Sequence, residues 1–185
     1  AFIVYPLVTQ AISAKAIVTP AKNWGHDLTA MQAAIRDDTR LIFIANPNNP
    51  TGTYVDKTRL KTFLDAVPEQ VLVVLDEAYY EYATAESPDY PNSLDWLTDS
   101  PNLITVRTFS KAYGLAGLRV GYSISHPDMA GLLNRLRQPF NVNNHAILAA
   151  TAALADNEHL EKSVALNRQG MQQLTQAFKS LKLDF

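Results

Sequence analysis

Three short runs of apolar and β-branched residues constrain the fold of this chain more than any other feature. They span residues 41–45, 71–75 and 103–107. The unbroken run at 41–45 is typical of a strand buried on both faces of a parallel sheet, and the other two runs are also predicted to be strands. Helical segments are predicted at Asp27–Arg36, where Asp27 is suited to cap the helix, and at Asp56–Ala66. This alternation predicts an α/β fold with a mostly parallel sheet sandwiched between helices.

Further elements are predicted along the rest of the chain. Two more strands are expected, at Ile17–Pro20 and Leu118–Ile124. Three helices are predicted beyond them, at Asp128–Leu136, Asn144–Ala155 and Glu158–Lys182. In the last helix, apolar residues recur at spacings of four and three. We interpret them as a stripe that packs on the domain or leads into a neighbouring one, rather than as a free coiled coil.

The composition excludes several classes of function. The 185 residues carry 16 Lys+Arg and 18 Asp+Glu, a formal net charge of −2, so a broad basic surface for nucleic acid or an anionic membrane is not expected. The absence of cysteine removes disulfides and thiol nucleophiles, and the four histidines lack ligand spacing, so no metal site is predicted. No apolar run approaches the length of a membrane span. We therefore expect a cytoplasmic protein.

Charged residues follow the predicted strands at positions where an unpaired charge is costly. Asp76 ends an apolar run, and a carboxylate there needs a cation or hydrogen-bond donors. Lys111 lies beyond the strand at 103–107, and a lysine in a partly buried, cation-rich pocket exposes a nucleophilic amine. Arg119, at the start of the strand predicted from Leu118, has a guanidinium suited to a phosphate or a carboxylate. Considered singly, each also fits a structural role: a turn cap, a solvated lysine or an ion pair.

Taken together, these residues match the needs of pyridoxal phosphate, which requires an amine for its aldehyde, a carboxylate for its ring nitrogen and a cation for its phosphate. Three motifs surround them, at residues 45–52, 76–79 and 108–121, and they read ANPNNPTG, DEAY and TFSKAYGLAGLRVG. In this order and spacing the motifs resemble the fold-type I, pyridoxal-phosphate-dependent aminotransferases of class I/II. Within that family the chain most closely resembles the histidinol-phosphate branch.

The resemblance implies a role for residues around the cofactor ring. Lys111 would form the covalent bond to the cofactor's aldehyde and later act as the general acid and base. Asp76 would pair with the pyridine nitrogen. Asn49 and Tyr79 would hydrogen-bond the phenolic oxygen of the ring.

The resemblance also assigns residues to the phosphate and to the face of the ring. Ser110 and Arg119 would bind the phosphate, with Thr108 as a helper. Phe2 aligns with the family's ring-stacking aromatic residue, and Tyr5 is the alternative. Further phosphate donors are expected upstream of the chain, an arginine for the substrate carboxylate downstream, and a tyrosine from a partner subunit.

The resemblance implies a domain organisation as well. Residues 1–156 are expected to form the large cofactor-binding domain, a three-layer α/β/α arrangement truncated at its N-terminal side. Residues 157–185 are expected to form a long helix that leads to a small C-terminal domain, most of which is absent. The chain is thus expected to be a fragment of a longer protein.

The implied activity is transamination of histidinol phosphate with 2-oxoglutarate in histidine biosynthesis, by a homodimer acting on a small-molecule amino donor and a 2-oxo acid. Three alternatives remain open from the sequence. They are a lyase of the threonine-phosphate decarboxylase type, an aromatic or aspartate-type aminotransferase, and a cofactor-sensing effector domain of a transcription regulator. No basic segment in the chain favours the last of these.

Overall fold

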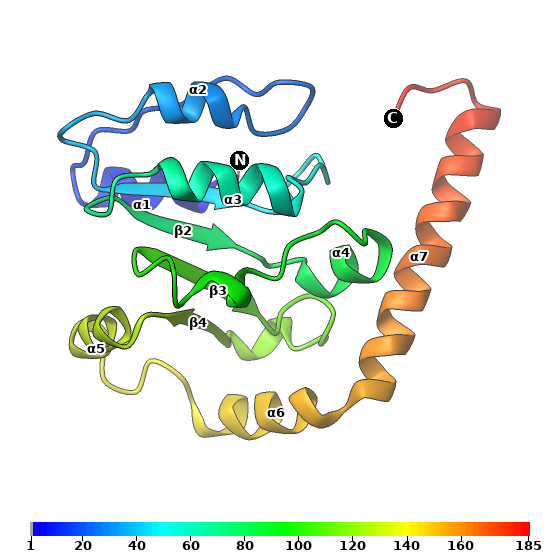
Figure 1. The fold of residues 1–185 in the computed structure, drawn as a ribbon. Helices are drawn as coiled ribbons and strands as arrows, with labels where there is room; N and C mark the ends of the chain where they lie inside the picture. Colours follow the sequence, from blue (N-terminus) through cyan, green and yellow to red (C-terminus); the bar gives the residue numbers. More distant parts are fainter. Residues whose placement is uncertain (1) are drawn as a thin grey trace. The chain divides into compact units, whose positions relative to one another are not determined.

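The computed structural model describes residues 2–185, drawn in Figure 1. The chain forms two compact units. The first runs up to Thr108 and also includes Gly121–Asn141, and the second comprises Phe109–Val120 and Val142–Phe185. In the described part of the chain, no helix is both long and apolar enough to cross a lipid bilayer.

The first unit is built on a four-stranded sheet. Its strands are β1 (Leu41–Ala45), β2 (Leu72–Asp76), β3 (Leu103–Thr108) and β4 (Gly121–Ser125), in that spatial order. Strands β1, β2 and β3 are parallel, and β4 pairs antiparallel with β3. The predicted α/β fold with a mostly parallel sheet is therefore confirmed.

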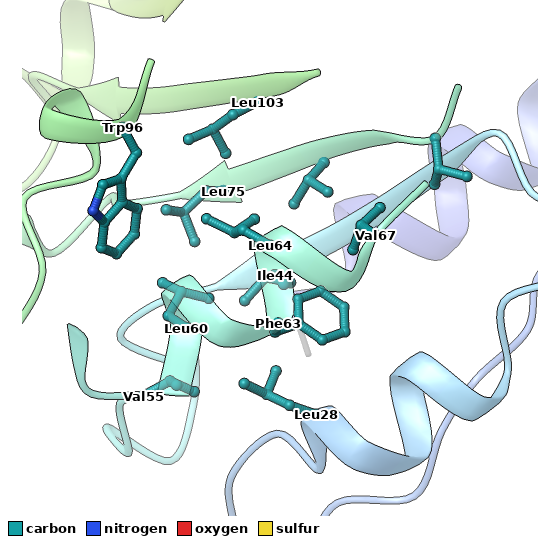
Figure 2. Packing of buried hydrophobic residues seen from close by; sticks show 12 residues of the cluster. Leu28, Ile44, Val55, Leu60, Phe63, Leu64, Val67, Leu75, Trp96 and Leu103 are labelled. Carbon is teal, nitrogen blue, oxygen red and sulfur yellow. The ribbon is translucent and has the colours of Figure 1, made fainter. Parts of the chain in front are cut away.

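One face of this sheet is covered by α2 (Leu28–Ala33) and α3 (Lys57–Ala66). An aspartate caps each helix, because Asp27 and Asp56 accept hydrogen bonds from backbone amides of the first turn. The buried hydrophobic core lies between α3 and the strands, as Figure 2 shows. It consists of Leu28, Ile44, Val55, Leu60, Phe63, Leu64, Val67, Val71, Val73, Leu75, Trp96 and Leu103.

The other face of the sheet carries α1 (Val4–Ala11). Successive strand residues point to opposite faces, so Phe43 and Asp76 lie on the opposite side from Ile44. Tyr5 of α1 stacks on Phe43, with ring centroids 4.8 Å apart and an interplanar angle of 7°. The sheet therefore separates two helical layers, as the three-layer prediction requires.

Three shorter or peripheral elements complete the first unit. They are α4 (Tyr80–Glu86), a 3-10 helix at Ser93–Trp96 and α5 (Pro127–Leu136), which packs beside β4. Helices α1 and α4 were not predicted from the sequence. Each is short, and neither has a side-chain cap at its N-terminus that would mark where it begins.

The second unit consists mainly of α6 (Asn144–Ala155) and α7 (Asn157–Ser180), together with a 3-10 turn at Ala116–Leu118. Asn143 and Asp156 cap the two helices by accepting backbone N–H groups of the first turn. Both helices agree with the sequence prediction to within two residues at each end.

The apolar stripe predicted in the last helix lies along α7 and is not buried in the described chain. Met171 and Leu174 are 56% and 52% exposed, respectively. Packing of this stripe on a domain or a neighbouring segment stays a prediction.

The predicted strand at Ile17–Pro20 is wrong. Ile17 and Val18 are 40% and 83% exposed, and no strand among residues 2–185 pairs with this segment. A strand needs such a neighbour to satisfy its backbone N–H and C=O groups. The β-branched residues of this segment favour an extended backbone, but they do not provide a neighbouring strand.

The strand predicted at Leu118–Ile124 begins three residues later, at Gly121. Arg119 precedes it with a left-handed backbone (φ 53°, ψ 49°) at the end of the 3-10 turn. A Cβ at Gly121 would lie 2.8 Å from the carbonyl oxygen of Arg107, so only glycine fits where the chain enters β4. The prediction that Arg119 starts the strand is therefore corrected.

Candidate active site

The carboxyl ends of the parallel strands form one edge of the sheet. Ala45 of β1 is in register with Asp76 of β2, and Asp76 is in register with Val106 of β3. The loops that follow these strands carry most of the predicted site residues. In α/β sheets, this edge is where ligands bind.

Asp76 is the last residue of β2, and both of its carboxylate oxygens accept a hydrogen bond. The backbone N–H of Ala78 donates to Oδ1 at 3.0 Å. The hydroxyl of Tyr5 donates to Oδ2 at 2.6 Å. The half-buried carboxylate is therefore oriented from two sides, which suits an acceptor for a ring N–H.

Asn49 and Tyr79 belong to the loops after β1 and β2, and they are in contact. The Asn49 side-chain amide donates to the Tyr79 hydroxyl at 2.9 Å. These are the two residues expected to bind the phenolic oxygen of the cofactor ring, and the fold brings them together across thirty positions of sequence.

Buried Asn46 shapes the loop that carries Asn49. Its side-chain amide donates to the Val55 carbonyl at 3.0 Å, and its Oδ1 accepts the Val55 N–H at 2.7 Å. Its own backbone N–H donates to the Asp76 carbonyl at 2.9 Å, and the Tyr90 hydroxyl donates to its carbonyl. The turn after β1 is thereby tied to the end of β2.

His26 supports the end of β1 from outside the sheet. Its Nε2 lies 2.9 Å from the carbonyl oxygen of Ala45, the residue in register with Asp76. Burial lowers the pKa of His26, and the bond to Ala45 opposes this only in part. The imidazole is therefore neutral near pH 7, with the proton on the nitrogen that donates to the carbonyl.

A buried ion pair joins the residue after β2 to the second-to-last residue of β3, and we did not predict it from the sequence. Nη2 of Arg107 lies 2.7 Å from Oε2 of fully buried Glu77, and Nε donates to the same oxygen at 2.8 Å. The guanidinium also lies over the ring of Tyr80, 3.5 Å from its centroid. Burial raises the pKa of Glu77, and the charge of Arg107 opposes this.

A signal for this pair was present in the sequence. Glu77 and Arg107 carry opposite charges and stand at the polar ends of neighbouring predicted strands. The register Asp76 to Val106 places the two residues opposite one another, one position further along.

The expected covalent lysine lies in the second unit, in the loop Phe109–Val120. Phe109 and Ala112 are buried on either side of Ser110 and Lys111. Lys111 closes a turn by accepting the Gly114 N–H at 2.9 Å on its carbonyl. Lys111 itself is exposed. Its two buried neighbours hold its backbone at a defined place in the loop.

The same loop is closed by backbone hydrogen bonds. The N–H of Phe109 donates to the Val120 carbonyl at 3.2 Å, and the N–H of Leu115 donates to the Phe109 carbonyl at 2.9 Å. Arg119 is exposed and donates from Nη1 to the Ala116 carbonyl at 2.8 Å. The left-handed turn at Arg119 is thus stabilised by its own side chain.

The two units divide the predicted site residues between them. Ser110, Lys111 and Arg119 belong to the second unit. The others, Phe2, Asn49, Asp76, Tyr79 and Thr108, belong to the first. Convergence of the two sets on one ligand stays a prediction.

Thr108 and Phe2 lie at the margins of the first set. Thr108 is the final residue of β3 and pairs with Gly121. The ring of Phe2 meets Tyr5 edge to face, with centroids 5.9 Å apart. Neither contact tests the role expected for these two residues.

The fold and the residues at the sheet edge define the class of protein. Residues 4–185 match the family described as aminotransferase class I and II. The chain belongs to this family.

Two curated proteins are identical to this chain at more than half of its positions. The chain is 58% identical over 184 residues to histidinol-phosphate aminotransferase 1 of Nitrosococcus oceani, covering all of this chain and 49% of that protein. It is 60% identical over 185 residues to histidinol-phosphate aminotransferase 2 of Pseudomonas fluorescens, covering 50% of that protein. The chain thus spans about half the length of these relatives.

Solved structures resemble the chain over most of its length. Histidinol-phosphate aminotransferase from Sinorhizobium meliloti, in complex with pyridoxal-5'-phosphate, matches with a TM-score of 0.88 and 35% identity, covering 94% of this chain and 46% of that one. L-threonine-O-3-phosphate decarboxylase from Porphyromonas gingivalis matches with a TM-score of 0.73 and 26% identity, covering 86% and 46%.

Proposed function

We propose that the protein containing this chain is a pyridoxal-phosphate-dependent aminotransferase. It transfers the amine of histidinol phosphate to 2-oxoglutarate, which gives imidazole acetol phosphate and glutamate. The observation that carries the proposal is the sheet edge itself, where Asp76 is oriented by two donors and Asn49 is bonded to Tyr79. The choice of substrate rests on relatives of 58–61% identity that bear this enzyme's name.

The residues present fit pyridoxal phosphate by their chemistry. Asp76 offers an oriented carboxylate for the pyridine nitrogen, and the bonded Asn49 and Tyr79 offer neighbouring hydrogen-bond donors for the phenolic oxygen. Ser110 and Arg119 offer a hydroxyl and a guanidinium for the phosphate, with Thr108 as a further hydroxyl. When bound, the cofactor supplies a sink for the electron pair left on the substrate's Cα.

The chain's own residues orient the reacting groups and handle protons. Asp76, as a carboxylate, would keep the proton on the ring nitrogen, which the electron sink requires. Lys111 would hold the cofactor through its amine. As a free amine, Lys111 would be the general base that takes the proton from the substrate's Cα, and its protonated form would be the acid that gives it back.

The proposal includes the assembly and the location expected from the family resemblance. We propose a homodimer in the cytoplasm, in which each site takes residues from both subunits. A small-molecule amino donor and a 2-oxo acid are the only substrates that this scheme needs.

A screen of amine donors with the protein that contains this chain tests the function. Histidinol phosphate with 2-oxoglutarate should yield glutamate in stoichiometric amount, without carbon dioxide. A phosphatase-treated donor, histidinol, serves as the matched control for the phosphate. No glutamate from any donor would contradict the proposal.

The second candidate is a decarboxylase, favoured by the structural match to L-threonine-O-3-phosphate decarboxylase. Carbon dioxide released from threonine phosphate without any 2-oxo acid would identify that activity. The same assay therefore separates the two reactions by their products.

A further inference from the structure

Tyr5 contacts both Phe43 and Asp76, and the proposed reaction gives it no role. It lies in the first turn of α1, and its ring stacks on Phe43 at 4.8 Å with an angle of 7° between the planes. Stacked aromatic rings fix one another's orientation. The Tyr5 ring is therefore held against β1, on the sheet face that Asp76 shares.

From this position the hydroxyl reaches Asp76. Its oxygen lies 2.6 Å from Oδ2, a distance typical of a hydroxyl bonded to an ionised carboxylate. The Ala78 N–H binds the other oxygen at 3.0 Å. The two donors come from α1 and from the turn after β2, so rotation of the carboxylate would break both bonds.

Tyr5 can only act as the donor in this pair. Burial, together with the bond to Asp76 and the charge of that carboxylate, raises the pKa of Tyr5 well above its usual value. The phenol is therefore protonated throughout the physiological range. A carboxylate has about four acceptor sites, so Asp76 keeps capacity for a further donor while Tyr5 is bound.

We propose that Tyr5 is a positioning residue for the cofactor's ring nitrogen, and that it acts by holding and polarising the Asp76 carboxylate. This inference rests on the proposed function, since it needs a pyridine ring at Asp76. A donated hydrogen bond stabilises the ionised carboxylate. The proton shared between Asp76 and the ring nitrogen therefore stays on the nitrogen, where the electron sink needs it.

The test uses the protein that contains this chain and two readouts other than turnover. These are the affinity for pyridoxal phosphate, from fluorescence titration, and the chemical shift of the ring nitrogen in bound cofactor labelled with ¹⁵N. Tyr5→Phe keeps the ring on Phe43 and removes only the hydroxyl. We expect a ¹⁵N shift toward the unprotonated pyridine and, for one lost hydrogen bond, no more than about tenfold weaker cofactor binding.

Tyr54→Phe is the matched control. The Tyr54 hydroxyl also donates to an aspartate, Asp89, at 2.8 Å, but at an exposed position. The control removes the same chemical group and should leave both the affinity and the ¹⁵N shift as in the unmodified protein. 3-Fluorotyrosine at position 5 keeps the hydroxyl and makes it a stronger donor, so it should move the ¹⁵N signal in the opposite direction to Tyr5→Phe.

The outcomes separate this inference from the proposed function. If the unmodified protein does not bind pyridoxal phosphate, the proposed function fails, and the inference fails with it. If it binds the cofactor while Tyr5→Phe and the fluorinated variant leave the ¹⁵N signal unchanged, the inference alone is overturned. Weaker binding by Tyr5→Phe without any ¹⁵N change would also overturn it, because that result would describe a merely structural role.

Discussion

The chemistry proposed for this chain depends on single side chains placed at strand ends. Asp76 illustrates how little freedom such a residue has. Its backbone belongs to β2, its carbonyl accepts the Asn46 N–H, and its side chain is bonded to Tyr5 and Ala78. Effects of substitution at this scale should therefore be large and specific to one step.

Lys111→Ala should abolish both the visible absorption of lysine-bound cofactor and transamination, since no other amine is proposed to join the aldehyde. Absorption spectra and a glutamate assay measure the two effects. Lys179→Ala, in the last turn of α7, removes the same charge at an exposed site and should change neither. Turnover retained by Lys111→Ala would count against the assignment.

Asp76→Asn should slow proton removal from the substrate's Cα by on the order of a hundredfold or more, because a neutral amide does not hold the proton on the ring nitrogen. Cofactor affinity should change much less. Single-turnover kinetics with a Cα-deuterated donor measure the proton-transfer rate directly. Asp89→Asn, at an exposed site, is the control, and an unchanged rate in Asp76→Asn would remove the proposed role.

We expect the free energy of unfolding to depend on pH through His26. Its pKa in the folded protein lies below the ordinary value of 6.5, because burial disfavours the charged ring. Its contribution is therefore fully present above pH 6.5 and is lost as the pH falls toward the folded pKa, because the unfolded chain binds the proton more readily.

Urea unfolding at pH 7.5 and pH 5.5 measures this effect. The free energy of unfolding should be lower at pH 5.5 than at pH 7.5, and His26→Gln should make this difference smaller. His145→Gln, at an exposed position in α6, should leave the difference as in the unmodified protein. An equal fall in His26→Gln and the unmodified protein would show that His26 does not cause it.

At the scale of elements, the sheet edge is held together by polar contacts between successive strands. Asn46 ties the loop after β1 to β2, and the pair of Glu77 and Arg107 joins the ends of β2 and β3. Asp76 directly precedes Glu77, and Thr108 directly follows Arg107. The buried ion pair thus links two strands from which predicted site residues extend.

Arg107→Ala should destabilise the protein by about 3–5 kcal/mol, because it leaves the buried Glu77 without its counter-charge. Lys57→Ala is a matched control, since its ion pair with Asp95 spans 3.7 Å between half-exposed side chains. That pair should be worth no more than about 1 kcal/mol. Urea unfolding compares the two, and equal losses would mean that the buried pair has no special role.

At the scale of the whole molecule, the predicted site residues are divided between two compact units of one chain. A ligand that binds the folded protein but not the unfolded one raises its stability by mass action. At a pyridoxal phosphate concentration a hundred times the dissociation constant, the gain should be about 2.7 kcal/mol. Thermal unfolding with and without cofactor measures it, with Lys111→Ala showing a smaller gain, and no gain in the unmodified protein would argue against binding.

Much of the fold was predictable because its signals are local. Apolar runs at 41–45 and 71–75 indicated two strands of the sheet, and Asp27 indicated the start of a helix. The three motifs indicated the family, and the match over residues 4–185 confirms it. The strand predicted at Ile17–Pro20 was wrong, because a strand also needs a partner elsewhere in the chain.

The amino-acid sequence alone was enough for the alternation of strands and helices, the family, and the acid, amine and guanidinium expected to bind a cofactor. It did not lead us to predict the bonds from Tyr5 to Asp76, from Arg107 to Glu77, and from Asn49 to Tyr79. These bonds join residues 71, 30 and 30 positions apart. Such partners are chosen by strand register and by the packing of α1 on the sheet, and both arise from the summed burial of many side chains rather than from any local pattern.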